Sequence, residues 1–285
     1  MADSTRTTTG FDLDAYLERI GWTGERRADA DTLWGTHLAH LEAIAFENLD
    51  AVGGTAPSLG LGDLMAKLVH DRRRGGYCYE HNTLYATALE ALGFGVTRLS
   101  ARVVLGAERF EDRPRTHMAL LVEIPGDPRR CLADVGFGAI GSLLEPVPLV
   151  ADTEFYGAGR RHRLVRVPHR GPLEMWVLEA HDTPAEPSRG GWTAQYAFTL
   201  EPFEHSDYEV VNWHVATNPR SPFSHRLYVQ RLTPDGHLLL DGDRVTGTGD
   251  DGTVTERKLD DEADARRVLA EDFGIDAPDG LTLLS

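Results

Sequence analysis

The chain of 285 residues is 41% hydrophobic and 26% charged, which is typical of a soluble globular protein with one to three domains and excludes a disordered chain. Its formal net charge of −16 disfavours nucleic acid or an anionic membrane surface as a primary partner, because both bind clustered lysine and arginine. Neither the apolar stretch of a signal peptide nor a run near the ~20 apolar residues that span a bilayer occurs, so we expect a cytoplasmic protein whose two cysteines are reduced thiols.

Helical periodicity dominates the first ninety or so residues. Residues 29–46 read as a helix with acidic residues in its first turn, where the helix dipole favours them. In residues 61–71, leucine, methionine and valine recur at helical spacing on one face. A third helix is predicted to begin at about Cys78 and to end before Gly93, which stands at the position of a C-terminal cap. Residues 1–93 are therefore predicted to form a helical bundle.

From Gly95 the pattern changes to alternating, β-branched runs. Six strands are predicted, over residues 95–105, 117–124, 131–137, 161–168, 175–180 and 193–200. These strands predict an antiparallel sheet or small barrel over residues 94–203, with an exposed loop at the Pro-, Ser- and Gly-rich residues 181–191. In the last segment, residues 204–285, we predict a helix over 206–216, a hairpin over 237–248, and a helix over 261–274 that Gly274 ends.

One thiol stands where a helix is predicted to begin, in the sequence RRRGGYCYEHN of residues 72–82. The unpaired N–H groups of a first helical turn favour the thiolate of Cys78, which is the nucleophilic form. Gly75 and Gly76 allow close backbone approach and leave room for an incoming carbonyl group. The alternative is a small buried hydrophobic residue, as most free cysteines are, and on position alone the two interpretations are about even. The choice between the two depends on partner residues.

A catalytic cysteine needs a histidine base and a third group that orients the imidazole. His117 stands at the entrance of one apolar strand, and Asp134 near the end of the next, among apolar neighbours. A histidine and an aspartate at the ends of consecutive strands favour a Cys–His–Asp triad with Cys78. Strand alternation places the second thiol, Cys131, on the opposite face from Asp134, so we expect it to be packed in the core.

These segments resemble those of the arylamine N-acetyltransferases. RRGGYCYEHN is similar to the family's RGGxCxE signature, THMALLV to its histidine segment and DVGFG to its aspartate segment. The segments YLERIGW, HLAHLEAIAFENLD and TNPRSPFSHRLYVQRL also resemble family segments, in the same order. The resemblance implies that Cys78, His117 and Asp134 are the triad. It also implies an α+β fold of a helical bundle, a central antiparallel β-barrel and a C-terminal α/β lid, built around a cysteine-protease-like core.

Further site residues follow from the resemblance. It implies a buried structural ion pair between Arg74 and Glu47 near the site. It also implies a substrate and coenzyme A cleft, for which the expected residues are Thr116, Gly136, Phe137 and Phe223. The loop over residues 105–115 departs from the family, since it carries charges where related bacterial members often have apolar or aromatic residues near the cofactor.

The activity that the resemblance implies is ping-pong transfer of an acetyl group from acetyl-CoA, through an acyl-cysteine, to arylamines, arylhydrazines or N-hydroxyarylamines. Acetyl-CoA is then a substrate, and no metal or tightly bound cofactor is expected; a homodimer is compatible with this interpretation. The closest alternative is an amide synthase of the same family, which releases or cyclises a polyketide thioester. A thiol hydrolase or transglutaminase-like enzyme and a non-catalytic binding protein are the more distant alternatives.

A glycine motif competes with this interpretation. Gly136, Gly138 and Gly141 match GxGxxG, but a dinucleotide site requires a helix directly after the motif. The following residues, SLLEPVPLV, hold two prolines and show no helical pattern. We therefore reject a dinucleotide site. The absence of CxxC and HExxH motifs from the sequence gives a zinc site no support.

Overall fold

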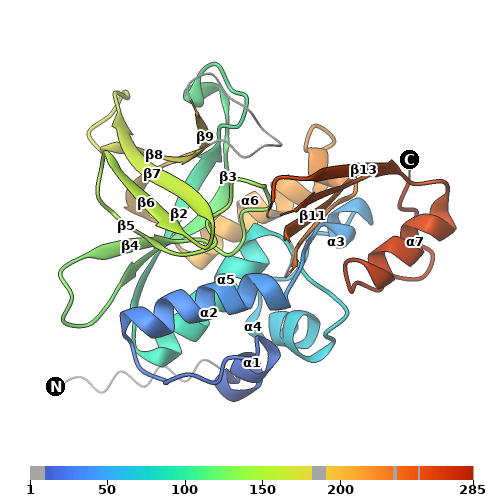
Figure 1. Cartoon of the computed structure of the whole chain (residues 1–285), viewed down its shortest axis with the longest axis horizontal. Coiled ribbons are helices and arrows are strands. Elements are labelled where there is room, and N and C mark those ends of the chain that lie inside the picture. The colour runs from blue at the N-terminus through green and yellow to red at the C-terminus, as the bar shows by residue number, and fades with distance from the viewer. Residues whose placement is uncertain (1–9, 182–190, 234–235, 250, 285) are drawn as a thin grey trace.

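Two antiparallel sheets and seven α-helices make up the part of the chain that this computed structural model describes, residues 10–181, 191–233, 236–249 and 251–284 (Figure 1). An eight-stranded barrel lies on one side and a five-stranded sheet on the other, with helices between and below them. The observed architecture confirms the predicted α+β class. Of the predicted loop over residues 181–191, residues 182–190 lie outside the described part of the chain.

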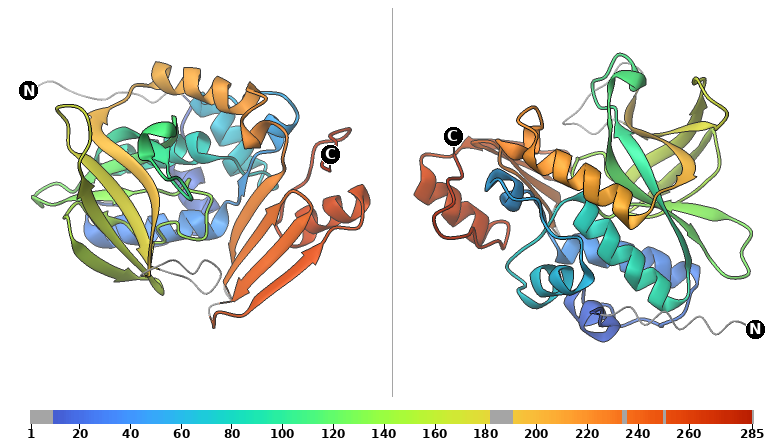
Figure 2. Two further views of the ribbon diagram at one scale, coloured as in Figure 1. Left: turned by 90° about the horizontal axis from the view of Figure 1, so that it is seen from above. Right: turned by 180° about the vertical axis from the view of Figure 1, so that it is seen from behind.

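The N-terminal helices form the predicted bundle around one central helix. The elements are α1 (Leu13–Arg19), α2 (Ala30–Ala43), α3 (Leu49–Val52), α4 (Leu61–Leu64), the π-helix η1 (Met65–His70) and α5 (Cys78–Leu92). Helix α5 begins at Cys78 as predicted, and Gly93 ends it with a left-handed φ of 98°. Almost every residue of α5 is buried, because the other helices and strand β3 (Arg115–Glu123) surround it (Figure 2). The nucleophile candidate is thus fixed to the most enclosed helix.

The predicted helix over residues 29–46 is too long. It stops at Ala43, and Phe46–Glu47 form a short strand, β1, instead. This strand pairs with Gln230 and Val229 of β10 (Tyr228–Thr233), a partner about 180 residues away. The tertiary pairing overrides the local helical preference, and it ties the C-terminal sheet to the bundle.

The barrel consists of the strands that the alternating runs predicted and two more, β5 and β6. Its strands are β2 (Gly95–Val103), β3, β4 (Arg130–Ala133), β5 (Val147–Pro148), β6 (Thr153–Gly157), β7 (Arg160–Val167), β8 (Met175–His181) and β9 (Trp192–Pro202), and the helix η2 (Phe110–Asp112) lies between β2 and β3. The sheet order is β5-β4-β3-β2-β9-β8-β7-β6. The two edge strands, β5 and β6, follow one another directly in the chain. The sheet therefore curls into a barrel that is nearly closed.

Strand β4 ends four residues earlier than predicted, and side chains explain why. After Ala133 the backbone leaves the ladder, and its N–H groups find side-chain acceptors instead. Asp134 N–H donates to His37 Nε2 at 3.1 Å, and Val135 N–H donates to Asn82 Oδ1 at 3.1 Å. Because these acceptors satisfy the buried backbone without a neighbouring strand, residues 134–137 form a loop that is fixed to the bundle.

The C-terminal part holds the second sheet and two helices. Its elements are α6 (His205–Thr217), η3 (Pro222–Ser224), β10, β11 (Gly236–Asp241), β12 (Arg244–Gly249), β13 (Val254–Lys258) and α7 (Glu262–Glu271). The predicted hairpin is present as β11 and β12, with Gly242 at a φ of 61° in its turn. Tyr208 and Val215 of α6 belong to the hydrophobic core of the bundle, so α6 connects the lid to the helices.

Alternation along β3 separates two cores. Met118, Leu120 and Val122 face the bundle, whereas Ala119 and Leu121 face the barrel interior. His117 therefore lies on the barrel face of β3. No helix among the described residues is long and apolar enough to cross a membrane.

Candidate active site

Cys78 occupies the first position of α5, at the bottom of the cleft between barrel and lid. The helix start is held by Glu80, whose Oε2 accepts the N–H of Tyr77 at 3.0 Å. A Cβ on Gly75 would lie 1.9 Å from the carbonyl oxygen of Ala45, and one on Gly76 2.7 Å from Glu80 Oε2. The two glycines therefore let the nucleophile turn pack against Ala45 and its own helix, which is the close backbone approach expected of them. Neither glycine lines the cleft, so the expectation that they leave room for an incoming carbonyl group is wrong.

His117 and Asp134 meet as the strand pattern predicted. Leu120 on β3 pairs with Ala133 on β4, so the residues just beyond this pair lie next to each other. His117 Nε2 and Asp134 Oδ2 are 2.6 Å apart, and both side chains are almost fully buried. Because Nε2 of His117 bonds to Asp134, Nδ1 is the ring nitrogen that remains to bond the thiol of Cys78.

The buried carboxylate of Asp134 is held from three sides. Its Oδ1 accepts the side-chain amide of Asn82 and the backbone N–H of Gly136, each at 2.9 Å. Burial by itself would raise the pKa of Asp134, but the charge and hydrogen bond of His117, with these two further bonds, lower it. Asp134 therefore stays ionised while fully buried.

His117 is poised to carry a positive charge. Burial is the largest single effect and opposes that charge, but Asp134 overcomes it through its own charge and hydrogen bond. Cys78 adds a smaller contribution of the same kind, and the pKa of His117 rises to about 10. At neutral pH the imidazole is thus stabilised in its protonated form beside the thiol.

Two residues that the sequence did not single out position Asp134. Asn82 lies one helical turn after Cys78, and its amide also donates to Met118 O at 2.7 Å. His37 accepts the N–H of Asp134 and donates through Nδ1 to Leu144 O at 3.0 Å. Burial lowers the pKa of His37 to about 4, so it is neutral, as an acceptor must be. The only sequence signal for either residue was the i, i+4 spacing of Asn82 from Cys78.

The cleft above the triad has a volume of about 900 Å³. Cys78, His117, Thr116, Gly136, Phe137 and Phe223 all line it, together with parts of the loop over residues 105–115 and of α6, η3, β10 and β11. Asp134 does not line it, because it lies behind the imidazole of His117. A ligand in the cleft can therefore contact Cys78 and His117 but not Asp134.

Three of the predicted cleft residues lie against the triad, and the fourth, Phe223, packs on Phe46 with ring centres 6.0 Å apart. The Phe137 ring packs on His117 with ring centres 5.1 Å apart, and Tyr196, which the sequence did not indicate, packs on the same imidazole at 5.0 Å. Thr116 O lies 3.9 Å from Cys78 Sγ. A Cβ on Gly136 would lie 2.7 Å from Cys78 Cα, so only glycine lets this loop approach the nucleophile.

The chain is similar to known proteins over nearly its whole length. A family model described as N-acetyltransferase matches residues 29–281. The arylamine N-acetyltransferase of Mycolicibacterium smegmatis is 41% identical over 273 residues, which cover 94% of each chain. The crystal structure of the Nocardia farcinica arylamine N-acetyltransferase is 41% identical, covers 95% of this chain and 92% of that one, and has a TM-score of 0.86. The chain belongs to the arylamine N-acetyltransferase family.

Another solved member of this N-acetyltransferase family contains a ligand. The Mycobacterium marinum arylamine N-acetyltransferase, in complex with CoA, is 36% identical, covers 93% of each chain and has a TM-score of 0.82. This ligand, CoA, belongs to the donor class that the resemblance implied. In the described part of this chain, no group of three or more His, Cys, Asp or Glu residues could hold a metal ion.

The ion pair expected from the resemblance to arylamine N-acetyltransferases is present, and it is part of a larger set. Arg74 contacts Glu47 at 2.9 Å and Asp50 at 2.7 Å. Lys67, which the sequence did not indicate, contacts Asp50 at 2.6 Å and Glu80 at 2.7 Å. We call these five mostly buried residues the Lys67 cluster. Through Glu80 the cluster holds the helix start that carries Cys78.

The glycines of the GxGxxG match have packing roles in this family member. A Cβ on Gly138 would lie 2.9 Å from the Phe46 ring, and one on Gly141 2.3 Å from Gln195. No helix follows them, since the next regular element is the strand β5. The helix that a dinucleotide-binding motif requires directly after its glycines is therefore missing from this described segment.

Proposed function

We propose that this chain transfers an acetyl group from acetyl-CoA to arylamines, arylhydrazines or N-hydroxyarylamines through an acyl-cysteine at Cys78. The observation that carries the proposal is the order Cys78, His117, Asp134 from the cleft inward, with the imidazole bonded to a buried carboxylate at 2.6 Å. The names of the relatives support arylamines as acceptors, and no observation favours the amide synthase alternative.

In the first half-reaction the Cys78 thiolate attacks the carbonyl carbon of the thioester. The backbone N–H groups at the start of α5 stabilise the oxyanion, and the N–H of Cys78 is the nearest donor. The C–S bond to CoA then breaks, and CoA leaves with the proton of His117. The acetyl group remains on Cys78 as a thioester of similar energy, so no metal or ATP is needed.

In the second half-reaction an amine attacks the acetyl-cysteine. His117, now neutral, accepts the proton of the attacking nitrogen, and Cys78 leaves as a thiolate beside the regenerated imidazolium. Asp134 keeps the imidazole in the orientation that presents Nδ1 to the sulfur. An arylamine fits this step because its nitrogen is largely unprotonated at neutral pH, unlike the amine of lysine.

The test is to trap the acyl-enzyme. After incubation with acetyl-CoA and no amine, mass spectrometry is expected to find one acetyl group, on Cys78, which a later addition of arylamine removes. Cys78→Ala is expected to abolish both acetylation and arylamine turnover. Cys131→Ser is the matched control, because Cys131 is buried in the core away from the cleft, and burial raises the pKa of its thiol to about 11.

Three results would contradict the proposal. They are turnover of an arylamine by Cys78→Ala at the normal rate, an acetyl group on Cys131 instead, and hydrolysis of acetyl-CoA without a trapped intermediate. Release of CoA from none of the acetyl, propionyl and malonyl thioesters would favour the amide synthase alternative.

A further inference from the structure

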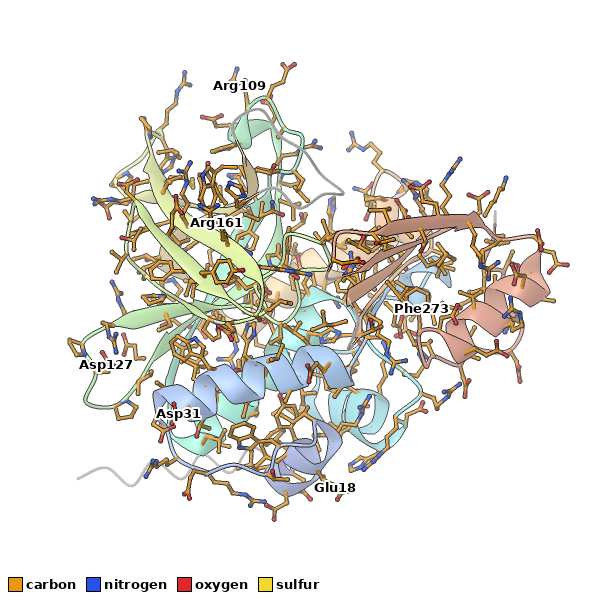
Figure 3. The ribbon with its side chains drawn as sticks, viewed as in Figure 1. Glu18, Asp31, Arg109, Asp127, Arg161 and Phe273 are labelled. Carbon is orange, nitrogen blue, oxygen red and sulfur yellow. The ribbon has the colours of Figure 1, made fainter. Side chains whose placement is uncertain are left out.

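A second cavity, of about 290 Å³, lies outside the cleft and is surrounded by guanidinium groups. Its arginines are Arg19, Arg72, Arg73, Arg74 and Arg231, and we call the cavity the arginine pocket. They come from α1, from the turn before Cys78 and from β10, and the end of α7 completes the wall. Figure 3 labels two neighbours of the pocket, Glu18 on α1 and Phe273 beyond α7. Such a concentration is unexpected in a chain with 29 basic and 45 acidic residues.

Three of these arginines have carboxylate partners. Arg72 pairs with Glu18 at 2.8 Å and Arg73 with Asp276 at 2.6 Å. Arg74 belongs to the Lys67 cluster, where Glu47 and Asp50 neutralise it. The acidic residue among the described wall residues, Glu271, is itself bound to Arg267 at 3.0 Å.

Arg19 and Arg231 are different, because they bond only to backbone carbonyl groups. Arg19 donates to Ala43 O at 2.7 Å and to Leu68 O at 3.0 Å, and Arg231 donates to Asp272 O at 3.3 Å. In the described ranges no carboxylate lies within 4.0 Å of either guanidinium. These carbonyls lie at or near helix ends, so capping explains where the two arginines sit. Capping leaves the positive charges of Arg19 and Arg231 without a negative partner among the described residues.

The surroundings of Arg19 indicate residual positive potential in the pocket. Burial lowers the pKa of Arg19, and the charges of Arg72 and Arg231 lower it further, as expected for guanidinium groups that repel one another.

We propose that the arginine pocket binds a small multivalent anion of the diphosphate class. Guanidinium groups have planar sets of N–H donors that match phosphate oxygens in pairs. Two unneutralised charges favour a ligand with at least two negative charges. Since water occupies about 30 Å³ per molecule in the liquid, the pocket has room for about ten waters or for a diphosphate with part of its hydration shell.

The pocket is a separate site from the cleft. Ala45 lines the arginine pocket, whereas the next residue of the chain, Phe46, lines the cleft. The backbone of β1 is therefore the wall between them. Binding in the arginine pocket does not depend on the proposed acetyl transfer, so the two proposals can fail independently.

The test is calorimetric titration of the whole chain with inorganic pyrophosphate at low ionic strength. We expect one site per chain, binding that weakens as salt is added, and a loss of about tenfold or more in affinity for Arg231→Gln. Arg19→Gln is expected to act in the same way; if it does not fold, Arg231→Gln still decides the question, because Arg231 makes a single long carbonyl contact.

Two variants are controls. Arg129→Gln, in the turn before β4, where Arg129 pairs with Asp127 on the surface, and Arg220→Gln, in the wall of the cleft, are expected to bind pyrophosphate as the unmodified chain does. Absence of binding at up to about 5 mM pyrophosphate, unchanged binding by Arg231→Gln, or lost binding by Arg220→Gln would each overturn the proposal. ADP is titrated in parallel: equal affinity indicates a nucleotide source for the diphosphate, and weaker affinity indicates the free anion.

Discussion

Asn82 connects the nucleophile helix to the loop that carries Asp134. It is fully buried, and it donates to Asp134 Oδ1 and Met118 O and accepts from Val135 N–H. Asn82→Ala is expected to lower the free energy of unfolding by about 2 kcal/mol or more, because it leaves buried polar groups unsatisfied. Asn82 does not line the cleft, so kcat for an arylamine should fall about tenfold or more while KM changes little, through a misoriented imidazole.

Thr87→Ala is the matched control for this prediction. Thr87 is buried on the same helix, and its hydroxyl bonds only to Thr83 O, at 2.9 Å, among the contacts of the described residues. It should lose some stability and keep kcat. If Asn82→Ala raised KM and left kcat unchanged, Asn82 would be a substrate-binding residue and not a positioning residue.

Helix α5 shows how far local sequence reaches at the scale of an element. Its start at Cys78 and its end at Gly93 could be predicted, because a glycine cap and a helical stripe are encoded within a few residues. Likewise, His117 and Asp134 could be paired because strand ends and consecutive strands are local features. The triad geometry was therefore accessible from the sequence.

Elements whose partners are distant in the chain were not accessible. Strand β1 exists because β10 pairs with it, and residues 134–137 leave β4 because side chains from α2 and α5 accept their N–H groups. The sequence did not indicate Lys67, because its role depends on three acidic residues that folding brings together. No periodicity in the sequence reports such contacts.

Lys67 connects the start of helix α5 to the other charged residues of the Lys67 cluster. Lys67→Met would remove one of the two positive charges that face three carboxylates, and we expect it to lower the free energy of unfolding by about 3 kcal/mol at pH 8. Burial already raises the pKa of Glu80 to about 7, with Lys67 opposing the rise. Without Lys67 this pKa should rise further. Protonated Glu80 removes one negative charge, so the loss should be smaller at pH 6.

Urea unfolding at both pH values measures this effect. Lys258→Met is the matched control, because Lys258 pairs with Asp243 at 2.9 Å on the surface, and its removal should leave the midpoint unchanged at either pH. An equal loss of stability in Lys67→Met at pH 6 and pH 8 would mean that Glu80 does not titrate in this range.

At the scale of the whole molecule, buried histidines connect stability to pH. Burial lowers the pKa of His37, His81 and His162 to about 4 and that of His237 to about 3, and it also lowers the pKa of His40. In the unfolded chain these side chains titrate near 6.5. Between these values the unfolded state binds more protons than the folded state, so stability is present above pH 6.5 and is lost as the pH falls.

Two other groups act with the opposite sign. The pKa of Glu80 is raised, so as the pH falls from about 7 the folded state binds a proton at Glu80 before the unfolded state does. This proton cancels the effect of one buried histidine on the pH dependence of stability. The pKa of His117 is raised to about 10, so its contribution is complete below pH 6.5 and is lost as the pH rises toward 10. The free energy of unfolding should therefore be highest near pH 6.5 to 7 and should fall on both sides.

The acid side gives the sharper measurement. Five histidines less the one proton of Glu80 give an uptake on unfolding that rises to about four protons as the pH falls from 6.5 to 5, and each proton changes the free energy of unfolding by about 1.4 kcal/mol per pH unit. His162→Asn should reduce this slope by one proton, because the buried ring is then no longer available to titrate. His205→Asn, at an exposed position, should leave the slope unchanged. Denaturant midpoints across pH 5 to 9 test this, and stability that stays level or rises from pH 6.5 to 5 would show that the buried imidazoles do not control acid unfolding.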